Sequence, residues 1–260
     1  MHTCRTLRAR ALAFVTLTLV ATLSTPNSPA LADDAVTPDP VVAATISRVS
    51  PAAGLVPGGA VVTISGAHFT GATAVAFGAV AATRFTVTSD TTISAISPVL
   101  EAGTHQLAVT TAAGTTTAGT FVVRTLEDEV LRLVNDARST KRKCGSTTYK
   151  AVPALRADAK LARVAAAHSR DMAAHNYFSH ASRNGDSPFD RMKEAGYRYS
   201  SAGENIAAGY RTPSSVVKAW LKSPGHCKNI MRRGYTELGV GFAAGGYYGS
   251  YWTQDFGTPR

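Results

Sequence analysis

The 260-residue sequence is poor in several residue types, and each shortage narrows what the protein can be. It holds three cysteines and two tryptophans, and its 17 acidic residues are outnumbered by 27 lysines and arginines. No apolar run reaches the roughly 20 residues that a helix needs to cross a bilayer. Gly-x-Ser-x-Gly, His-Glu-x-x-His and the phosphate-binding loop are all absent, which excludes the machinery of several familiar hydrolases and nucleotide-binding enzymes.

Residues 1–32 have the order of a secretory signal peptide. Three arginines within the first ten residues precede an apolar run over residues 11–23, and Ala30-Leu31-Ala32 gives a small-x-small cleavage site. A membrane anchor is the alternative, but the run of about 13 residues is shorter than the roughly 20 that span a bilayer. We therefore expect cleavage after Ala32 and a secreted protein, extracellular or associated with the cell wall, without a transmembrane segment.

Removal of the signal leaves Cys144 and Cys227. An even number of cysteines in an exported chain favours a disulfide between them. The alternative is a reactive Cys227, because the imidazole of the adjacent His226 could lower the pKa of the thiol. The sequence favours the disulfide.

Charge is divided unevenly along the chain. Residues 33–123 carry two basic and five acidic residues, whereas residues 124–260 carry 22 basic and 12 acidic residues, a net charge of +10. A basic domain outside the cell could attract anionic cell-wall polymers or lipid headgroups, although a merely soluble basic surface is an equal alternative. Nucleic acid is not expected as a partner, because an exported protein rarely meets it.

Residues 33–41 contain two prolines and three aspartates without periodicity, which predicts a linker. From residue 42 to 123 the sequence alternates in short runs separated by glycine, proline and Ser-Asp turns. The predicted strands lie at 60–65, 73–77, 82–87, 92–96, 105–110 and 120–123. This spacing predicts an all-β sandwich of roughly 80 residues.

Four segments of this region, Ile46-Ser47-Arg48-Val49-Ser50-Pro51, Pro57-Gly58-Gly59, Ile64-Ser65-Gly66 and Val75-Ala76-Phe77-Gly78, resemble the IPT/TIG family. The resemblance implies an immunoglobulin-like fold over residues 42–123. It implies a spacer or adhesion role and no chemistry.

After residue 124 the apolar period changes from two to about 3.6. Helices are predicted from residue 126 to 137, from 157 to 176, and from the proline-led starts at 187 and 212. Alternation returns at 238–242 and 251–256 with Gly245-Gly246 between them, which predicts a hairpin. Residues 124–260 therefore form a predicted α+β domain.

Four polar residues of this domain lie in apolar or glycine-rich surroundings: His180, Glu204, His226 and Glu237. The two imidazoles could bind a divalent metal such as Zn²⁺, with the carboxylates as further ligands or as acceptors that orient the rings. The same residues could perform general acid-base chemistry without a metal. Their separations match no short metal-ligand motif, so spacing alone leaves both interpretations open.

The segments around these residues resemble bacterial CAP domains, the superfamily of cysteine-rich secretory, antigen 5 and pathogenesis-related proteins. The quoted stretches are Tyr177-Phe178-Ser179-His180, Gly203-Glu204-Asn205-Ile206-Ala207, Ser223-Pro224-Gly225-His226 and Tyr251-Trp252-Thr253-Gln254-Asp255-Phe256-Gly257. The resemblance implies a three-layer α-β-α sandwich over residues 124–260, with an open cleft in which two histidines and two glutamates sometimes hold a divalent cation.

His180 and Glu204 match this family pattern directly. Eukaryotic members carry the second glutamate near the helix equivalent to Trp220-Leu221 and the second histidine in a Gly-His-Tyr-Thr-Gln stretch. Here the remaining pair is His226 and Glu237, so the two residue types are exchanged. His168 shares a helix stripe with apolar residues and is expected to be a core histidine, and Asn205 is expected to brace the segment of Glu204.

Three functions are compatible with these features. The first is an extracellular binding protein whose cleft takes a lipid, glycan or peptide-like ligand while the β module holds it near the cell surface. The second is a hydrolase of cell-wall or protein substrates, with a metal on His180 and His226 and a glutamate as the base. The third is a structural adhesin in which the four residues form an internal polar network. The missing nucleophile favours the first.

Overall fold

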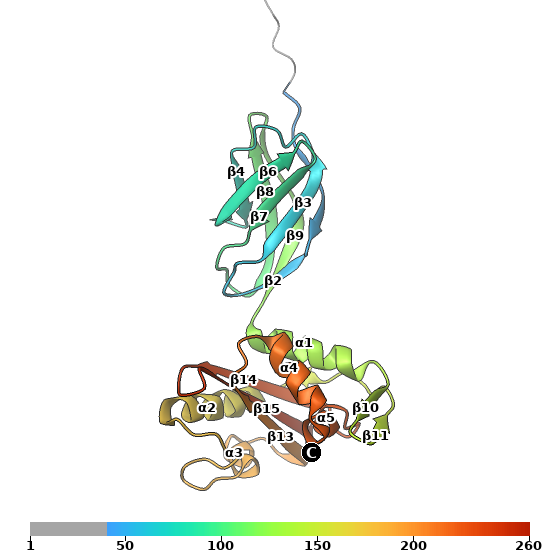
Figure 1. Cartoon of the computed structure of the whole chain (residues 1–260), viewed down its shortest axis with the longest axis vertical. Coiled ribbons are helices and arrows are strands. Elements are labelled where there is room, and N and C mark those ends of the chain that lie inside the picture. Colours follow the sequence, from blue (N-terminus) through green and yellow to red (C-terminus); the bar gives the residue numbers. More distant parts are fainter. Residues whose placement is uncertain (1–40) are drawn as a thin grey trace, which may run out of the picture. The chain divides into compact units, whose positions relative to one another are not determined.

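A computed structural model describes residues 41–260 (Figure 1). The predicted signal peptide and all but the last residue of the predicted linker lie outside these residues. Across this described part, no helix is both long and apolar enough to cross a bilayer.

The N-terminal module consists of two β-sheets. One has the strand order β1-β3-β7-β6, formed by Thr45–Ser50, Val61–Ala67, Thr92–Ile96 and Arg84–Ser89. The other has the order β2-β9-β8-β4-β5, formed by Ala53–Leu55, Gly114–Arg124, Gly103–Thr111, Ala74–Phe77 and Val80–Ala81. In β3, Val62 and Ile64 are fully buried while Val61 is exposed, so the period-two alternation of the sequence places one face in the core. The predicted all-β module is confirmed.

The C-terminal domain is built on a four-stranded sheet of order β12-β14-β15-β13. Its strands are β12 (Arg156–Ala157), β14 (Glu237–Ala244), β15 (Ser250–Pro259) and β13 (Tyr199–Ala208). Strand β15 pairs antiparallel with both β13 and β14, and its residues 250–256 are all buried. A small hairpin, β10 (Arg142–Cys144) and β11 (Thr147–Tyr149), lies outside this sheet.

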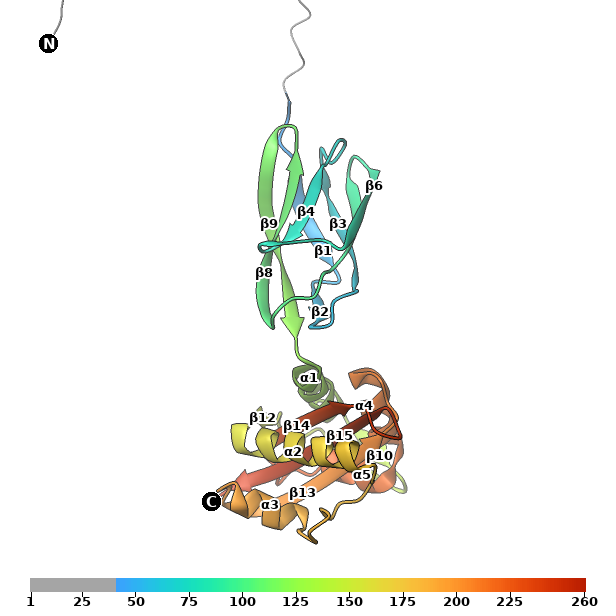
Figure 2. The ribbon, with the colours of Figure 1, turned by 90° about the vertical axis from the view of Figure 1, so that its left-hand side faces the viewer.

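Helices cover both faces of the sheet (Figures 1 and 2). On one face lie α2 (Ala159–His175) and α3 (Pro188–Glu194). On the other lie α1 (Leu126–Arg138), α4 (Pro213–Lys222) and α5 (Pro224–Ile230). The structure therefore confirms the predicted α+β domain with three layers.

Two glycines of β14 allow α2 to approach the sheet closely. A Cβ at Gly239 would lie 2.0 Å from the backbone carbon of Leu161, and one at Gly241 would lie 2.3 Å from that of Ala165. The neighbouring Val240 points to the opposite face and joins the core formed with α1 and α4. Alternate residues of β14 thus serve the two helical layers separately.

The helix starts that the sequence predicts are confirmed at two prolines. Ser187 and Thr212 each form a capping box, with Pro188 and Pro213 at the first helical position. Neither β13 nor α5 is predicted from the sequence. Strand β13 carries Glu204 in a glycine- and alanine-rich segment without clear alternation, and α5 has only seven residues, so neither gives a strong periodic signal.

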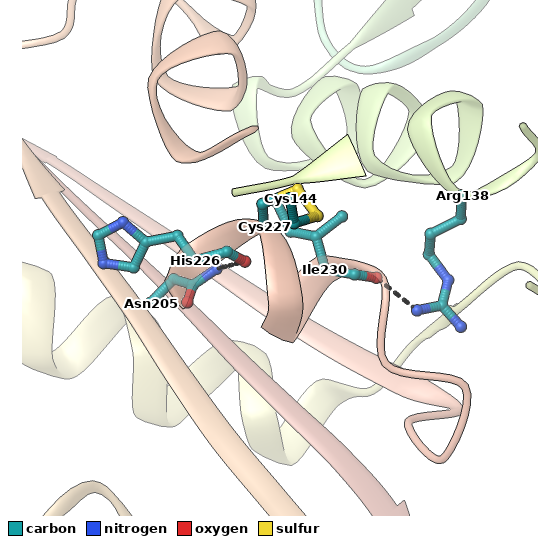
Figure 3. The surroundings of a disulfide bond; sticks show 6 residues. All are labelled: Arg138, Cys144, Asn205, His226, Cys227 and Ile230. Atoms are coloured by element: carbon teal, nitrogen blue, oxygen red, sulfur yellow. Dashed lines mark hydrogen bonds between the residues drawn. A yellow bond between two sulfur atoms is a disulfide. The ribbon is translucent and has the colours of Figure 1, made fainter. Parts of the chain in front are cut away.

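Cys144 and Cys227 form the predicted disulfide, with a Cα–Cα distance of 5.5 Å (Figure 3). It ties the hairpin strand β10 to α5. The fully buried Arg138 holds the end of α5 as well, because its guanidinium donates to the carbonyl oxygens of Ile230 at 2.6 Å and Arg232 at 3.1 Å. Burial lowers the pKa of Arg138 to about 10, which leaves it charged at neutral pH. The helix that carries His226 is therefore fixed at two points.

Candidate functional site

Glu204 lies at the centre of the candidate site, on strand β13. Its side chain is only 2% exposed, and each carboxylate oxygen accepts one short hydrogen bond. His180 Nδ1 lies 2.6 Å from Oε1, and Arg191 Nη2 donates to Oε2 at 2.6 Å. Because the carboxylate is buried, it needs these charge-assisted partners to offset the loss of water.

His180 presents its imidazole at the surface of the site. The chain reaches it after α2 ends at His175 and is capped by Asn176, whose φ of 55° lies in the left-handed region. The side chain of His180 is 53% exposed, although its Nδ1 is anchored to the buried Glu204. The anchored nitrogen fixes the ring plane, and Nε2 is left for a ligand or for water.

Arg191, on α3, donates hydrogen bonds both to side chains and to a backbone carbonyl of the site. Besides Glu204, its Nη1 donates to the carbonyl oxygen of His180 at 2.9 Å and to Ser182 Oγ at 3.0 Å. Its side chain is 10% exposed, so the ion pair with Glu204 is almost fully buried. The role of Arg191 is not predicted from the sequence, because an arginine in a short polar helix carries no signal of burial.

His226 lies on α5, beside the disulfide, and its ring points away from the sulfur atoms (Figure 3). Asn205 donates to the backbone oxygen of His226 at 3.2 Å, and Asn229 donates to Asn205 Oδ1 at 2.9 Å. Burial, followed by repulsion from the nearby His180, lowers the pKa of His226. Asn205, the residue after Glu204 on β13, therefore links the strand of Glu204 to the helix that carries His226.

Glu237 bonds to a different set of residues. Its carboxylate accepts from the Tyr197 hydroxyl at 2.7 Å and from Arg156 Nη2 at 3.4 Å. It sits at the start of β14, opposite Gly257 of β15. Within residues 41–260 it shares no hydrogen bond with the three other predicted site residues. His180 and Glu204 are joined directly, and Asn205 and Asn229 link the strand of Glu204 to the helix of His226.

Asp255 is a further acidic residue of the site that the sequence analysis did not single out. It lies directly opposite Glu204 in the register of β13 and β15 and is 0% exposed. Neither of its carboxyl oxygens has a hydrogen-bond donor among the described residues. Burial, together with the charge of Glu204, raises the pKa of Asp255 well above its usual range, and Arg191 only partly opposes this.

His168 is buried in α2, as its place on an apolar stripe predicts. Its Nε2 lies 2.9 Å from the carbonyl oxygen of Ser179, the residue before His180. Burial, aided by the positive charge of Arg191, lowers the pKa of His168. This histidine is therefore a neutral support for the segment that carries His180.

The side chains at this site do not form a full set of metal donors. Among residues 41–260, no group of three or more histidine, cysteine, aspartate or glutamate side chains is arranged to hold a metal ion. Both oxygens of Glu204 are already engaged by His180 and Arg191, which leaves two imidazoles as donors. A stable protein site for Zn²⁺ uses three or four ligands, so this arrangement does not fit one.

Three exposed aromatic side chains of the same domain, Phe178, Tyr247 and Tyr248, form a cluster. Phe178, two residues before His180, is 45% exposed and meets Tyr248 edge to face at 6.1 Å between ring centroids. Tyr247 is 83% exposed and contacts Tyr248 at 5.2 Å. The backbone N–H of Tyr247 donates to Asn176 Oδ1 at 2.7 Å, which ties this turn to the end of α2.

The sequence matches two family models. Residues 44–123 match the IPT/TIG domain, and residues 131–256 match CAP, the cysteine-rich secretory protein family. The chain is 42% identical over 142 residues to the uncharacterized protein YkwD of Bacillus subtilis, covering 55% of this chain and 51% of YkwD. It is 42% identical over 99 residues to the uncharacterized membrane protein YlbC of the same organism, covering 38% of this chain and 27% of YlbC.

The chain thus spans about half of the first of these relatives and about a quarter of the second. Among solved structures, an extracellular protein from Bacillus anthracis that contains an SCP domain is 34% identical, with a TM-score of 0.42 over 51% of this chain and 40% of that one. The two family matches, together with the folds described above, show that this chain carries an IPT/TIG domain at residues 44–123, followed at residues 131–256 by a domain of the CAP, or cysteine-rich secretory protein, family.

Proposed function

We propose that this is a secreted binding protein whose CAP domain takes a glycan-containing fragment of the cell wall at the site around His180. One observation carries the proposal. The imidazole of His180 is half exposed, yet its orientation is set by an almost completely buried carboxylate that is itself held by Arg191. A polar group fixed in advance at a surface loses little conformational freedom when a ligand binds.

The surroundings favour a glycan over a lipid. The exposed rings of Phe178, Tyr247 and Tyr248 offer flat apolar faces and two hydroxyl groups on the same domain, and Phe178 lies two residues before His180. Sugar rings combine apolar faces with many hydroxyl groups, so they complement such a surface. The net charge of +10 over residues 124–260 would add long-range attraction to an anionic cell-wall polymer. In this proposal the IPT/TIG domain holds the CAP domain near the cell surface.

The test is sedimentation of the purified protein with insoluble cell walls. His180→Ala should weaken binding at least about tenfold, equivalent to about 1.4 kcal/mol, because it removes the pre-oriented imidazole. His175→Ala is the matched control, since His175 is also a half-exposed histidine paired with a carboxylate, that of Asp171 at 2.8 Å, in the same domain. Equal binding by wild type and His180→Ala would refute the proposed site.

A hydrolase without a metal is the second candidate, and the contact between His180 and Glu204 favours it. A histidine whose Nδ1 is bound to a carboxylate is a common arrangement for a general base that activates water at Nε2. The metal-assisted form has less support, because the donors described above are too few. Release of soluble sugar or peptide from cell walls by wild type, and its loss in His180→Ala, would favour this candidate over binding alone.

A further inference from the structure

We propose that Asp255 is an un-ionised carboxylic acid at neutral pH and that its hydroxyl donates to the carboxylate of Glu204, so that Asp255 is a positioning residue for Glu204 and His180. The proposal concerns the internal structure of the site. It goes beyond the proposed function and stands whether or not the site around His180 binds a glycan.

The first support is the place of Asp255 in the sheet. Strand β15 is the central partner of both β13 and β14, so Asp255 has Glu204 on one side and Gly239 on the other. Paired residues of neighbouring strands direct their side chains to the same face, which here is the face covered by α2. The carboxyl groups of Asp255 and Glu204 are consequently neighbours in the protein interior, since both residues are buried.

The second support is the supply of hydrogen-bond donors. An ionised carboxylate in the protein interior needs donors or a cation, and neither oxygen of Asp255 has a donor among residues 41–260. In the described part of the chain the cation that acts on Asp255 is Arg191, and its Nη2 is committed to Glu204 at 2.6 Å. Two carboxylates with one cation cannot both remain charged there without a large cost.

The other titratable groups packed around Asp255 do not change this balance. His168, from α2, is held neutral by burial and by the charge of Arg191. On the α3 side the charged group is Arg191, and on β13 it is Glu204. Burial also raises the pKa of Asp255, in agreement with the missing donors.

A proton on Asp255 removes its negative charge and makes it a hydrogen-bond donor. Its O–H can donate to a lone pair of Glu204 that His180 and Arg191 leave free, because each carboxylate oxygen can accept two hydrogen bonds. Glu204 then accepts three hydrogen bonds, which hold its carboxylate in the plane needed to orient the His180 ring. Asp255 acts on the ring through Glu204 and does not touch the exposed surface.

Infrared spectroscopy of the full-length wild-type protein at pH 7 tests the protonation state directly. The proposal predicts a carbonyl stretching band of an un-ionised carboxylic acid, which shifts when aspartate is labelled with ¹³C and disappears in Asp255→Asn. Absence of this band from the wild-type protein would overturn the proposal, and this measurement does not require any variant to fold.

The positioning role is tested by two substitutions of similar size. The amide of Asp255→Asn can still donate to Glu204, so the NMR signal of the His180 Nδ1 proton should keep its wild-type position. Asp255→Leu removes the donor, so that signal should shift or be lost while the tryptophan fluorescence stays native. A folded Asp255→Asn protein in which the His180 signal is lost, or a folded Asp255→Leu protein in which it is unchanged, would overturn the role.

Discussion

Replacing Glu204 by glutamine is expected to destabilise the CAP domain by about 3 kcal/mol. The side chains of Glu204 and Arg191 are 2% and 10% exposed, so the substitution leaves a buried guanidinium without its counter-ion. Removing one partner of a buried ion pair typically costs about 3–5 kcal/mol. We expect the lower end, because Arg191 still donates to the His180 carbonyl oxygen and to Ser182. The melting temperature should fall by roughly 10 °C.

The same substitution on the surface gives a matched control. Glu129 pairs with Arg132 at 2.6 Å in α1, but the arginine side chain is 41% exposed. Exposed ion pairs contribute about 0–1 kcal/mol, so Glu129→Gln should change stability by less than about 1 kcal/mol. The two variants differ in the burial of the pair and share the chemistry of the substitution.

Urea unfolding followed by tryptophan fluorescence is the suitable assay. The chain has two tryptophans, Trp220 and Trp252, and both are buried in the CAP domain. Their emission therefore reports unfolding of this domain without a signal from the β module. If Glu204→Gln proves no more destabilising than Glu129→Gln, the buried pair does not support the site in the way described here.

Three further predictions concern the disulfide, the helix packing and pH. Replacing Cys144 and Cys227 by serine should lower the free energy of unfolding by about 4–5 kcal/mol, because the disulfide closes a loop with a sequence separation of 83 residues and so restricts the unfolded chain. Urea unfolding of the reduced and the oxidised wild-type protein measures the same difference. Gly239→Ala should destabilise the domain by more than about 2 kcal/mol, because its Cβ would overlap the α2 backbone. Gly225→Ala is the control, because a Cβ at Gly225 meets no atom within 4 Å and its φ is not positive, so it should change stability by less than about 1 kcal/mol; comparable melting curves for the two would contradict this close approach. The pKa of Asp255 is higher in the folded than in the unfolded protein, so its contribution to stability is complete at low pH. This contribution is lost as the pH rises from about 4 toward the raised pKa, by about 1.4 kcal/mol per pH unit. Asp255→Asn should remove this slope, and equal slopes of stability against pH in the two proteins would contradict the raised pKa.

Much of the architecture could be predicted from the sequence because its signals are local. Alternation in the β module and the 3.6-residue period of α1 and α2 reflect which face each element buries, and Ser187-Pro188 and Thr212-Pro213 mark helix starts through capping chemistry. The disulfide followed from the number of cysteines and the signal sequence. The family resemblance supplied His180 and Glu204 as partners, which no spacing rule would have joined.

The rest of the site depends on contacts that are distant in the sequence. Arg191 contributes to the site because α3 brings its guanidinium to the carboxylate of Glu204, and the sequence of α3 does not predict this ion pair. Asp255 could have been noticed as one acidic residue in a strand flanked by Trp252 and Phe256, since a carboxyl in a buried strand needs an explanation. Glu237 was expected as the second glutamate of a site with two histidines and two glutamates, but its position at the start of β14 gives it Tyr197 as a partner.

The central claim is that a cell-wall glycan contacts His180, and NMR of histidine side chains labelled with ¹⁵N tests it most directly. Soluble fragments of muramidase-digested peptidoglycan would be titrated into the full-length protein, with His175 and the β-module histidines His68 and His105 as internal references. The account predicts saturable shifts of the His180 ring, accompanied by smaller shifts of His226, while the reference histidines stay in place. Saturable binding that leaves the His180 signals unchanged would contradict it.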